Sequence, residues 1–249
     1  MTHGICGSGG NWRTIARAIV GRRPDWGIRL VDLRQHGHSE PGARPHTIAA
    51  CADDIRALID EVGPAAALAG HSFGGKVMLA TRALAPPELA QTWSLDASPS
   101  PRTADTTNET VIQLLAFVER SPPVWAKRDD FVAALVASHQ PRSLAQWFAM
   151  NLVPKDGGGY VFRLDTGAIH ALLADYAAID LWPSVLDASL PGSVELVVSS
   201  ESSTYTDEDR ARLAVLPPHV HADIVTAGHW LHIDNPSAVV ELFVARLPR

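Results

Sequence analysis

The sequence has few of the features that mark secreted, metal-binding or membrane proteins. It contains only two cysteines, Cys6 and Cys51, in 249 residues. This excludes a disulfide-rich scaffold, and we expect neither a disulfide nor a metal site from this pair. The first residues follow no signal-peptide pattern, and no apolar run is long enough to span a bilayer. We therefore expect a cytoplasmic protein.

Charge is also scarce. Charged residues make up 19% of the chain, and the net charge is −6. Lys and Arg are scattered along the sequence, so we predict no face for nucleic acid or for an anionic membrane. The expected partner is a small, uncharged or apolar molecule, and the oligomeric state stays open. The hydrophobic content of 46% suits one compact domain with a sizeable core.

The most informative stretch runs from Ala65 to Lys76, A-A-A-L-A-G-H-S-F-G-G-K. It reads as a buried strand, a tight turn and the start of a helix. The turn spells G-x-S-x-G, and only small residues on either side of Ser72 allow so sharp a bend. Such a turn lifts the serine hydroxyl above the sheet and aims the backbone N–H of Phe73 at an incoming carbonyl oxygen. Ser72 is therefore the candidate nucleophile, and Phe73 a candidate oxyanion donor.

The same stretch has two other interpretations. Residues 70–76 also spell G-x-x-x-x-G-K, the phosphate-binding loop of nucleotide hydrolases. Val77 follows, whereas that loop needs a Ser or Thr hydroxyl for Mg²⁺ at this position, so this interpretation is disfavoured. A glycine-rich turn without chemistry would leave the serine at its apex unexplained.

The remaining pattern alternates between strands and helices, as in an α/β fold. We expect strands at residues 28–33, 65–69, 91–95, 194–199 and 221–225, and helices at residues 12–20, 47–62, 73–84, 207–216 and 236–247. Residues 99–186 instead read as helical segments rich in bulky apolar side chains. We expect them to form a helical cap inserted into an α/β core made of residues 1–98 and 187–249. Most of the cap's aromatic residues should pack together, and a few should line a cleft suited to acyl chains.

Two loops complete the candidate site. Near the start, H-G-I-C-G-S-G-G-N-W begins at His3, and the backbone N–H of Ile5 is the candidate second oxyanion donor. The alternative is a flexible glycine-rich terminus. Near the end, A-G-H-W-L-H places His229 after a glycine at the end of the last strand, where a base is required. His232 is expected to be structural, as is the polar turn D-L-R-Q-H-G-H-S that starts at Asp32.

Two carboxylates compete for the position beside His229. Asp96 ends the strand that follows the nucleophile helix, so its side chain should emerge at the same sheet edge as Ser72. Glu201 lies in the serine-rich loop after the next strand and is the alternative acid. We favour Asp96, which begins the motif D-A-S-P.

These motifs together resemble the α/β-hydrolase superfamily. They are most similar to a group of small intracellular acyl esterases and thioesterases that includes abhydrolase domain-containing protein eleven. The resemblance implies a mostly parallel sheet flanked by helices, and a Ser72, Asp96 and His229 triad. It also implies hydrolysis of carboxylic esters or thioesters of small to medium apolar acyl groups through an acyl-enzyme, without cofactor or metal.

The same residues would also suit other functions. A carbon–carbon bond hydrolase, a lactonase or a cofactor-free perhydrolase would use the same triad. A nucleotide hydrolase and a catalytically silent binding protein are less favoured.

The sequence departs from this superfamily in two places. The acid usually follows the strand at residues 194–199, but Ser203 stands at the position of the expected aspartate. The N-terminal strands are missing, including one expected between residues 28–33 and 65–69. Loss of an interior strand leaves buried backbone groups unpaired on both sides. We therefore expect the chain as given to be poorly soluble, rearranged or oligomeric, and a version extended upstream to behave better.

Overall fold

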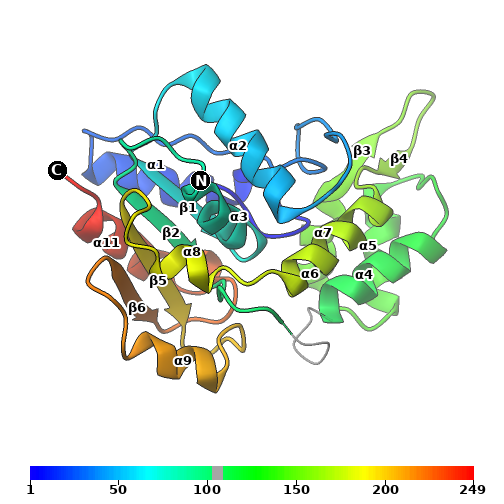
Figure 1. Ribbon diagram of the computed structural model, residues 1–249. Coiled ribbons are helices and arrows are strands. Elements are labelled where there is room, and N and C mark those ends of the chain that lie inside the picture. Colours follow the sequence, from blue (N-terminus) through cyan, green and yellow to red (C-terminus); the bar gives the residue numbers. More distant parts are fainter. Residues whose placement is uncertain (103–108) are drawn as a thin grey trace.

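The computed structural model describes residues 1–102 and 109–249. Four parallel strands form the central sheet, in the order β1 (Ala67–His71), β2 (Gln91–Leu95), β5 (Ser193–Ser199) and β6 (Val220–Val225). Helices lie on both sides of this sheet (Figure 1). Because both faces are covered, an interior strand such as β2 is buried at every residue. The predicted mostly parallel sheet flanked by helices is confirmed.

Each face of the sheet has its own set of helices. On one face, α1 (Arg13–Arg22) and α11 (Pro236–Arg246) pack against Trp93, Leu95 and Val197. On the other face lie α2 (Ile48–Val62), α3 (Phe73–Arg82) and α8 (Trp182–Leu186). Thr47 caps α2 by accepting a hydrogen bond from the Ala50 N–H. The short helices η1 (Gly9–Trp12), α9 (Asp207–Leu213) and α10 (Leu231–Asp234) lie in the connecting loops.

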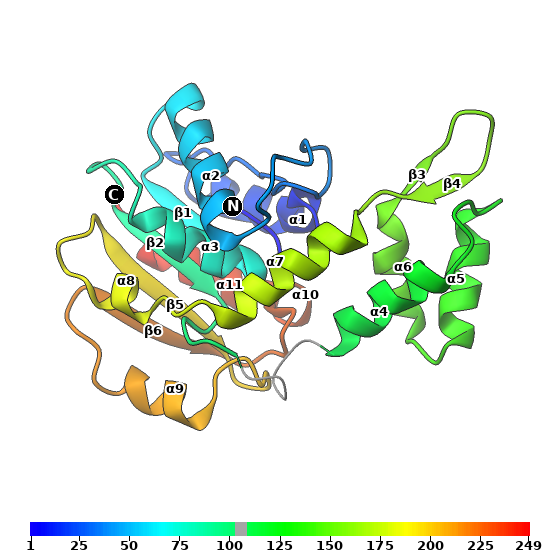
Figure 2. The same ribbon diagram turned by 45° about the vertical axis from the view of Figure 1, so that its right-hand side comes forward.

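A second group of elements lies to one side of the sheet (Figures 1 and 2). It consists of α4 (Glu109–Arg120), α5 (Arg128–Ala137), α6 (Arg142–Phe148), η3 (Ala149–Asn151), α7 (Thr166–Ala178) and the hairpin of β3 (Leu152–Pro154) and β4 (Tyr160–Phe162). Six aromatic rings of the described residues form one contacting set within this group, those of Phe117, Trp125, Phe131, Trp147, Phe148 and Phe162. The expectation that most aromatic residues here pack together is confirmed.

The prediction of a strand at residues 28–33 is wrong. Val31 makes only a single bridge, to Thr2, and Thr2 in turn bridges Gly70 of β1. The Thr2 N–H donates to the Ala69 carbonyl at 2.8 Å. The position expected for an interior strand is thus held by Met1 to His3, and a ladder cannot extend along residues 28–33 because its partner is so short. The other predicted elements are present, and none of their ends is shifted by more than three residues.

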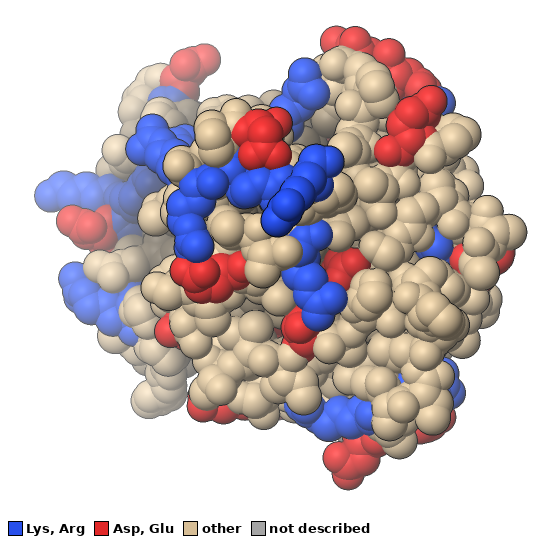
Figure 3. Space-filling view, turned by 90° about the vertical axis from the view of Figure 1, so that its left-hand side faces the viewer, with Lys and Arg blue, Asp and Glu red and all other residues tan. Residues whose placement is uncertain are grey.

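The side that carries α1 and α11 shows how the charges are distributed (Figure 3). Lys and Arg side chains gather on the upper part of this face, with Asp and Glu among them. Ion pairs account for part of this arrangement, since Arg22 pairs with Glu241 and Arg23 with Asp25. This face therefore offers no basic surface free of acidic groups. Within the described residues, no helix has the length and apolar character needed to cross a membrane.

Lys76 joins the two parts of the molecule. Its side chain is fully buried, and Nζ donates to the carbonyls of Ser100 (2.7 Å), Tyr176 (2.8 Å) and Ile179 (3.2 Å). Burial lowers the pKa of this ammonium to about 8. The phosphate-loop interpretation is therefore wrong, because the amine that would bind phosphate is already bound to carbonyls. Instead, Lys76 ties α3 to the segment before α4 and to the last turn of α7 with the residue that follows it.

Replacing this amine should destabilise the fold. In Lys76→Met three buried or partly buried carbonyls lose their donor, at up to about 1–3 kcal/mol each. This loss is partly offset because no charge has to be buried. We expect the free energy of unfolding in urea to fall by about 3 kcal/mol. Lys155→Met, at an exposed position, is the matched control and should change little. Equal midpoints for the two variants would contradict this role for Lys76.

Candidate active site

Ser72 stands at a sharp turn between β1 and α3. Its backbone is left-handed, with φ 52° and ψ −119°. A Cβ on Gly70 would lie 2.1 Å from the Gly74 carbonyl oxygen, and a Cβ on Gly74 would lie 2.5 Å from that of His3. Both glycines are therefore required by close backbone contacts. The predicted strand, turn and helix around Ser72 are confirmed.

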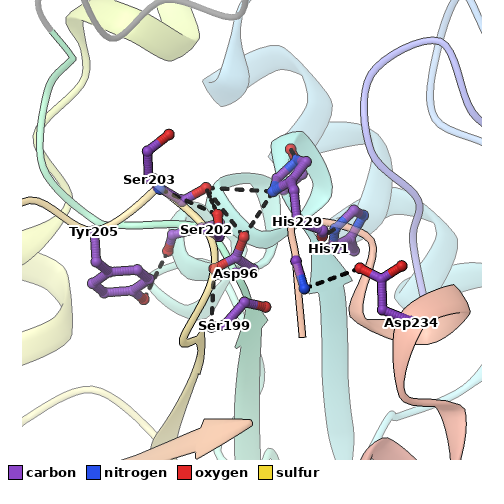
Figure 4. A network of polar contacts seen from close by, with 12 residues as sticks. His71, Asp96, Ser199, Ser202, Ser203, Tyr205, His229 and Asp234 are labelled. Carbon is purple, nitrogen blue, oxygen red and sulfur yellow. Dashed lines mark hydrogen bonds and ion pairs between the residues drawn. The ribbon is translucent and has the colours of Figure 1, made fainter. Parts of the chain in front are cut away.

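The structure brings Ser72, His229 and Asp96 together. Figure 4 shows the His229 ring beside the Asp96 carboxylate. Ser72 Oγ lies 3.0 Å from His229 Nε2, and His229 Nδ1 lies 2.7 Å from Asp96 Oδ2. The three residues follow β1, β6 and β2, whose carboxyl ends meet at one edge of the parallel sheet. This chain of hydrogen bonds can remove a proton from the serine hydroxyl and stabilise the resulting imidazolium.

Asp96 is buried and held by several donors. Its carboxylate accepts hydrogen bonds from the Ser199 N–H and the Thr204 hydroxyl, both at 3.1 Å, besides the His229 ring. The alternative acid, Glu201, is exposed, and its carboxylate makes no hydrogen bond or ion pair with the described residues. The contribution of Thr204 could not be predicted. The only hint in the sequence is its place next to Ser203, where the superfamily usually has its acid.

Both candidate oxyanion donors border the nucleophile. Ile5 and Phe73 line the same cavity as Ser72. Neither backbone N–H has an acceptor among the described residues, so both can bind a developing negative charge. Cys6, the next residue in the loop, is buried, and burial raises the pKa of its thiol to about 12. It packs in the core.

The polar turn after Val31 holds the loop that carries Ile5. Asp32 accepts from the Gly9 N–H at 2.6 Å and from the His38 N–H at 2.8 Å. His36 Nε2 accepts from the Cys6 N–H at 3.0 Å. The structural role predicted for this turn is therefore confirmed. It fixes the backbone of the loop from the outside, while His3 and Gly4 contact the Ser72 turn from within.

The cavity around Ser72 measures about 800 Å³. One side is apolar and comes from α4, α6 and α7, including Leu114, Leu144, Trp147, Leu173 and Tyr176. Another side is polar and comes from residues 201–204 of the serine-rich loop. Burial raises the pKa of the Tyr176 hydroxyl, although Arg102 and the hydrogen bond with Ser72 act to lower it. Among the described residues, no cluster of three or more potential metal ligands is present.

Three further histidines, His3, His36 and His71, lie buried around the site. Burial lowers the pKa of each ring, to about 3 for His36 and well below the usual value for His71. His36 Nε2 accepts the Cys6 N–H and His3 Nε2 accepts the Leu33 N–H, so both rings must stay neutral. The loop that carries Ile5 thus depends on unprotonated histidines.

Stability should consequently decrease in acid. Because the folded pKa values are depressed, the unfolded chain binds more protons below about pH 6.5, and the free energy of unfolding falls as pH drops. Each buried ring contributes up to about 1.4 kcal/mol per pH unit. We expect urea unfolding, followed by tryptophan fluorescence, to show full stability above pH 6.5 and a steep decline toward pH 5. His36→Gln should reduce this slope, and a flat profile between pH 7.5 and 5.5 would contradict the assignment.

Comparisons with known proteins agree with this geometry. A family model described as the alpha/beta hydrolase family matches residues 1–242. The sn-1-specific diacylglycerol lipase ABHD11 of Xenopus laevis is 30% identical over 247 residues, covering 94% of this chain and 74% of the relative. Esterase YbfF of Escherichia coli is 26% identical over 243 residues, covering 96% and 89%. A marine microorganism esterase of known structure matches with a TM-score of 0.85 at 23% identity, covering 99% and 93%.

The chain therefore belongs to the α/β hydrolase family. At the level of the family it is an enzyme of the esterase and lipase type.

Proposed function

We propose that this protein hydrolyses carboxylic esters or thioesters of small to medium apolar acyl groups through an acyl-enzyme. The proposal rests on the hydrogen-bonded chain from Ser72 Oγ through His229 to Asp96, at the base of a cavity with an apolar side. Residues 99–186, of which 99–102 and 109–186 are described, would act as the cap over this cavity. The two cysteines are free and buried, which suits the cytoplasm expected from the sequence.

In the first half-reaction, Ser72 Oγ attacks the acyl carbonyl carbon while His229 Nε2 accepts the serine proton. Asp96 keeps the proton on His229 Nδ1 and stabilises the imidazolium. The backbone N–H groups of Phe73 and Ile5 bind the oxyanion. Collapse of the tetrahedral intermediate expels the alcohol or thiol, which takes the proton from Nε2.

In the second half-reaction, water replaces the leaving group. His229 Nε2 takes a proton from the water as its oxygen attacks the acyl carbon, and returns it to Ser72 Oγ when the acid is released. The apolar side chains of the cavity would hold the acyl chain, since they offer few hydrogen-bond partners to a sugar or a phosphate.

A carbon–carbon bond hydrolase, a lactonase or a cofactor-free perhydrolase would use the same three residues. A panel of esters, thioesters, lactones and diketones, each measured as kcat/KM, separates them. The strongest turnover on a diketone, for example, would overturn the ester assignment.

Labelling tests whether the serine is activated. A fluorophosphonate probe should react with the folded protein at Ser72, because only a serine with a positioned base and an oxyanion site attacks the phosphorus readily. Ser72→Ala should not be labelled, and mass spectrometry should locate the adduct. Folded wild-type protein that remains unlabelled would favour a catalytically silent binding protein.

The identity of the acid can be tested with a pair of variants. Asp96→Asn should lower kcat on an activated ester by about 10³- to 10⁴-fold, because the amide no longer keeps the proton on His229 Nδ1. Glu201→Gln should stay within a few-fold of wild type, since its side chain is exposed. Circular dichroism checks the fold of both. A large loss in Glu201→Gln beside a near-normal Asp96→Asn would transfer the role to Glu201.

A further inference from the structure

His71, the residue before the candidate nucleophile, makes a contact that the triad does not explain. Its ring is 3% exposed, and Nε2 lies 2.8 Å from the backbone carbonyl oxygen of His229. A carbonyl oxygen only accepts hydrogen bonds, so Nε2 carries the proton. The bond joins the end of β1 to the loop after β6, 158 residues later in the chain.

The ring of His71 also fills the space between the two loops of the site. It lies 4.9 Å from the His229 ring and 5.2 Å from the His232 ring, centroid to centroid. On its other side, a Cβ on Gly4 would come within 3.2 Å of His71 Nδ1. His71 therefore contacts both the loop of His229, the candidate base, and the loop that carries Ile5. Figure 4 shows His71 next to His229.

The bond fixes a part of His229 that the triad leaves free. The hydrogen bonds to Ser72 and Asp96 orient the imidazole ring, but neither holds the peptide group of His229. That residue lies on a loop, between β6 and α10, with no ladder bonds of its own. A displacement of about 1 Å at a reacting group can cost about 100-fold in rate.

We propose that His71 is a positioning residue, which holds the backbone of His229 so that the imidazole stays in line with Ser72 and Asp96. This inference rests on the proposed roles of Ser72 and His229. The required form of His71 is neutral with the proton on Nε2, and its burial maintains that form.

Three variants separate the hydrogen bond from packing. His71→Leu removes the donor, and we expect kcat to fall by about 10- to 100-fold with KM within about twofold. His71→Gln retains an amide N–H that can donate to the same carbonyl, so most of the lost rate should return. The matched control is His219→Leu, which removes a similar bond, from His219 Nε2 to the Val185 carbonyl at 3.2 Å, away from the site. It should leave kcat unchanged.

Several results would overturn the positioning role. One is a folded His71→Leu with kcat within threefold of wild type. Another is a folded His71→Gln as impaired as His71→Leu. If instead Ser72→Ala and His229→Gln keep full activity, the proposed function itself fails. Loss of activity in those two variants but not in His71→Leu rejects only the positioning role.

A spectroscopic measurement needs neither a substrate nor a variant. In protein labelled with ¹⁵N-histidine, long-range proton–nitrogen spectra identify which ring nitrogen carries the proton. We expect His71 to be the Nε2–H tautomer at pH 7.5, with a slowly exchanging proton. A proton on Nδ1 would rule out donation to the His229 carbonyl and overturn the inference.

Discussion

The close backbone contact at the Ser72 turn is the constraint on which the rest of the site depends. Gly70 and Gly74 approach each other so closely that no side chain fits between them, and the segment that carries His3 packs against the same turn. The serine therefore has a left-handed backbone, held by the start of α3 and by the N-terminal segment. Because the loop with Ile5 continues directly from that segment, the candidate nucleophile and the candidate oxyanion donors are placed by one packing arrangement.

Backbone strain marks Asp96, the candidate acid, as well as Ser72, the candidate nucleophile. Among the residues with positive φ that are not glycine, Ser72 and Asp96 stand directly after neighbouring strands, β1 and β2. Such conformations cost about 1–3 kcal/mol each and persist only where the surroundings enforce them. The surroundings of Asp96 are its bonds to Ser199 and Thr204. The strained turns lift both side chains to the sheet edge where the loop after β6 supplies His229.

The sequence predicted those parts of the site that depend on local pattern. Ser72, His229 and Asp96 each follow a strand that could be recognised, and a parallel sheet brings such strand ends together. The strand at residues 28–33 was mispredicted because its pairing depends on a distant, very short segment at Thr2. Thr204 and His71 could not be assigned for the same reason, since their partners lie far away in the sequence and nothing local indicates them.

The contacts of the buried cations could not be predicted from local sequence either, because their acceptors also lie far away in the chain. Lys76 and Arg82 are both fully buried on α3, yet neither pairs with a carboxylate. Arg82 donates to four carbonyls of the irregular segment between α8 and β5 and to that of Ser184 within α8. Carbonyls at irregular positions need donors once they are buried, and a long cation supplies several from one side chain. The helix α3, which begins directly after Ser72, therefore also holds the end of α7, where Tyr176 lines the cavity. The position of the candidate nucleophile is in this way linked to one wall of the cavity.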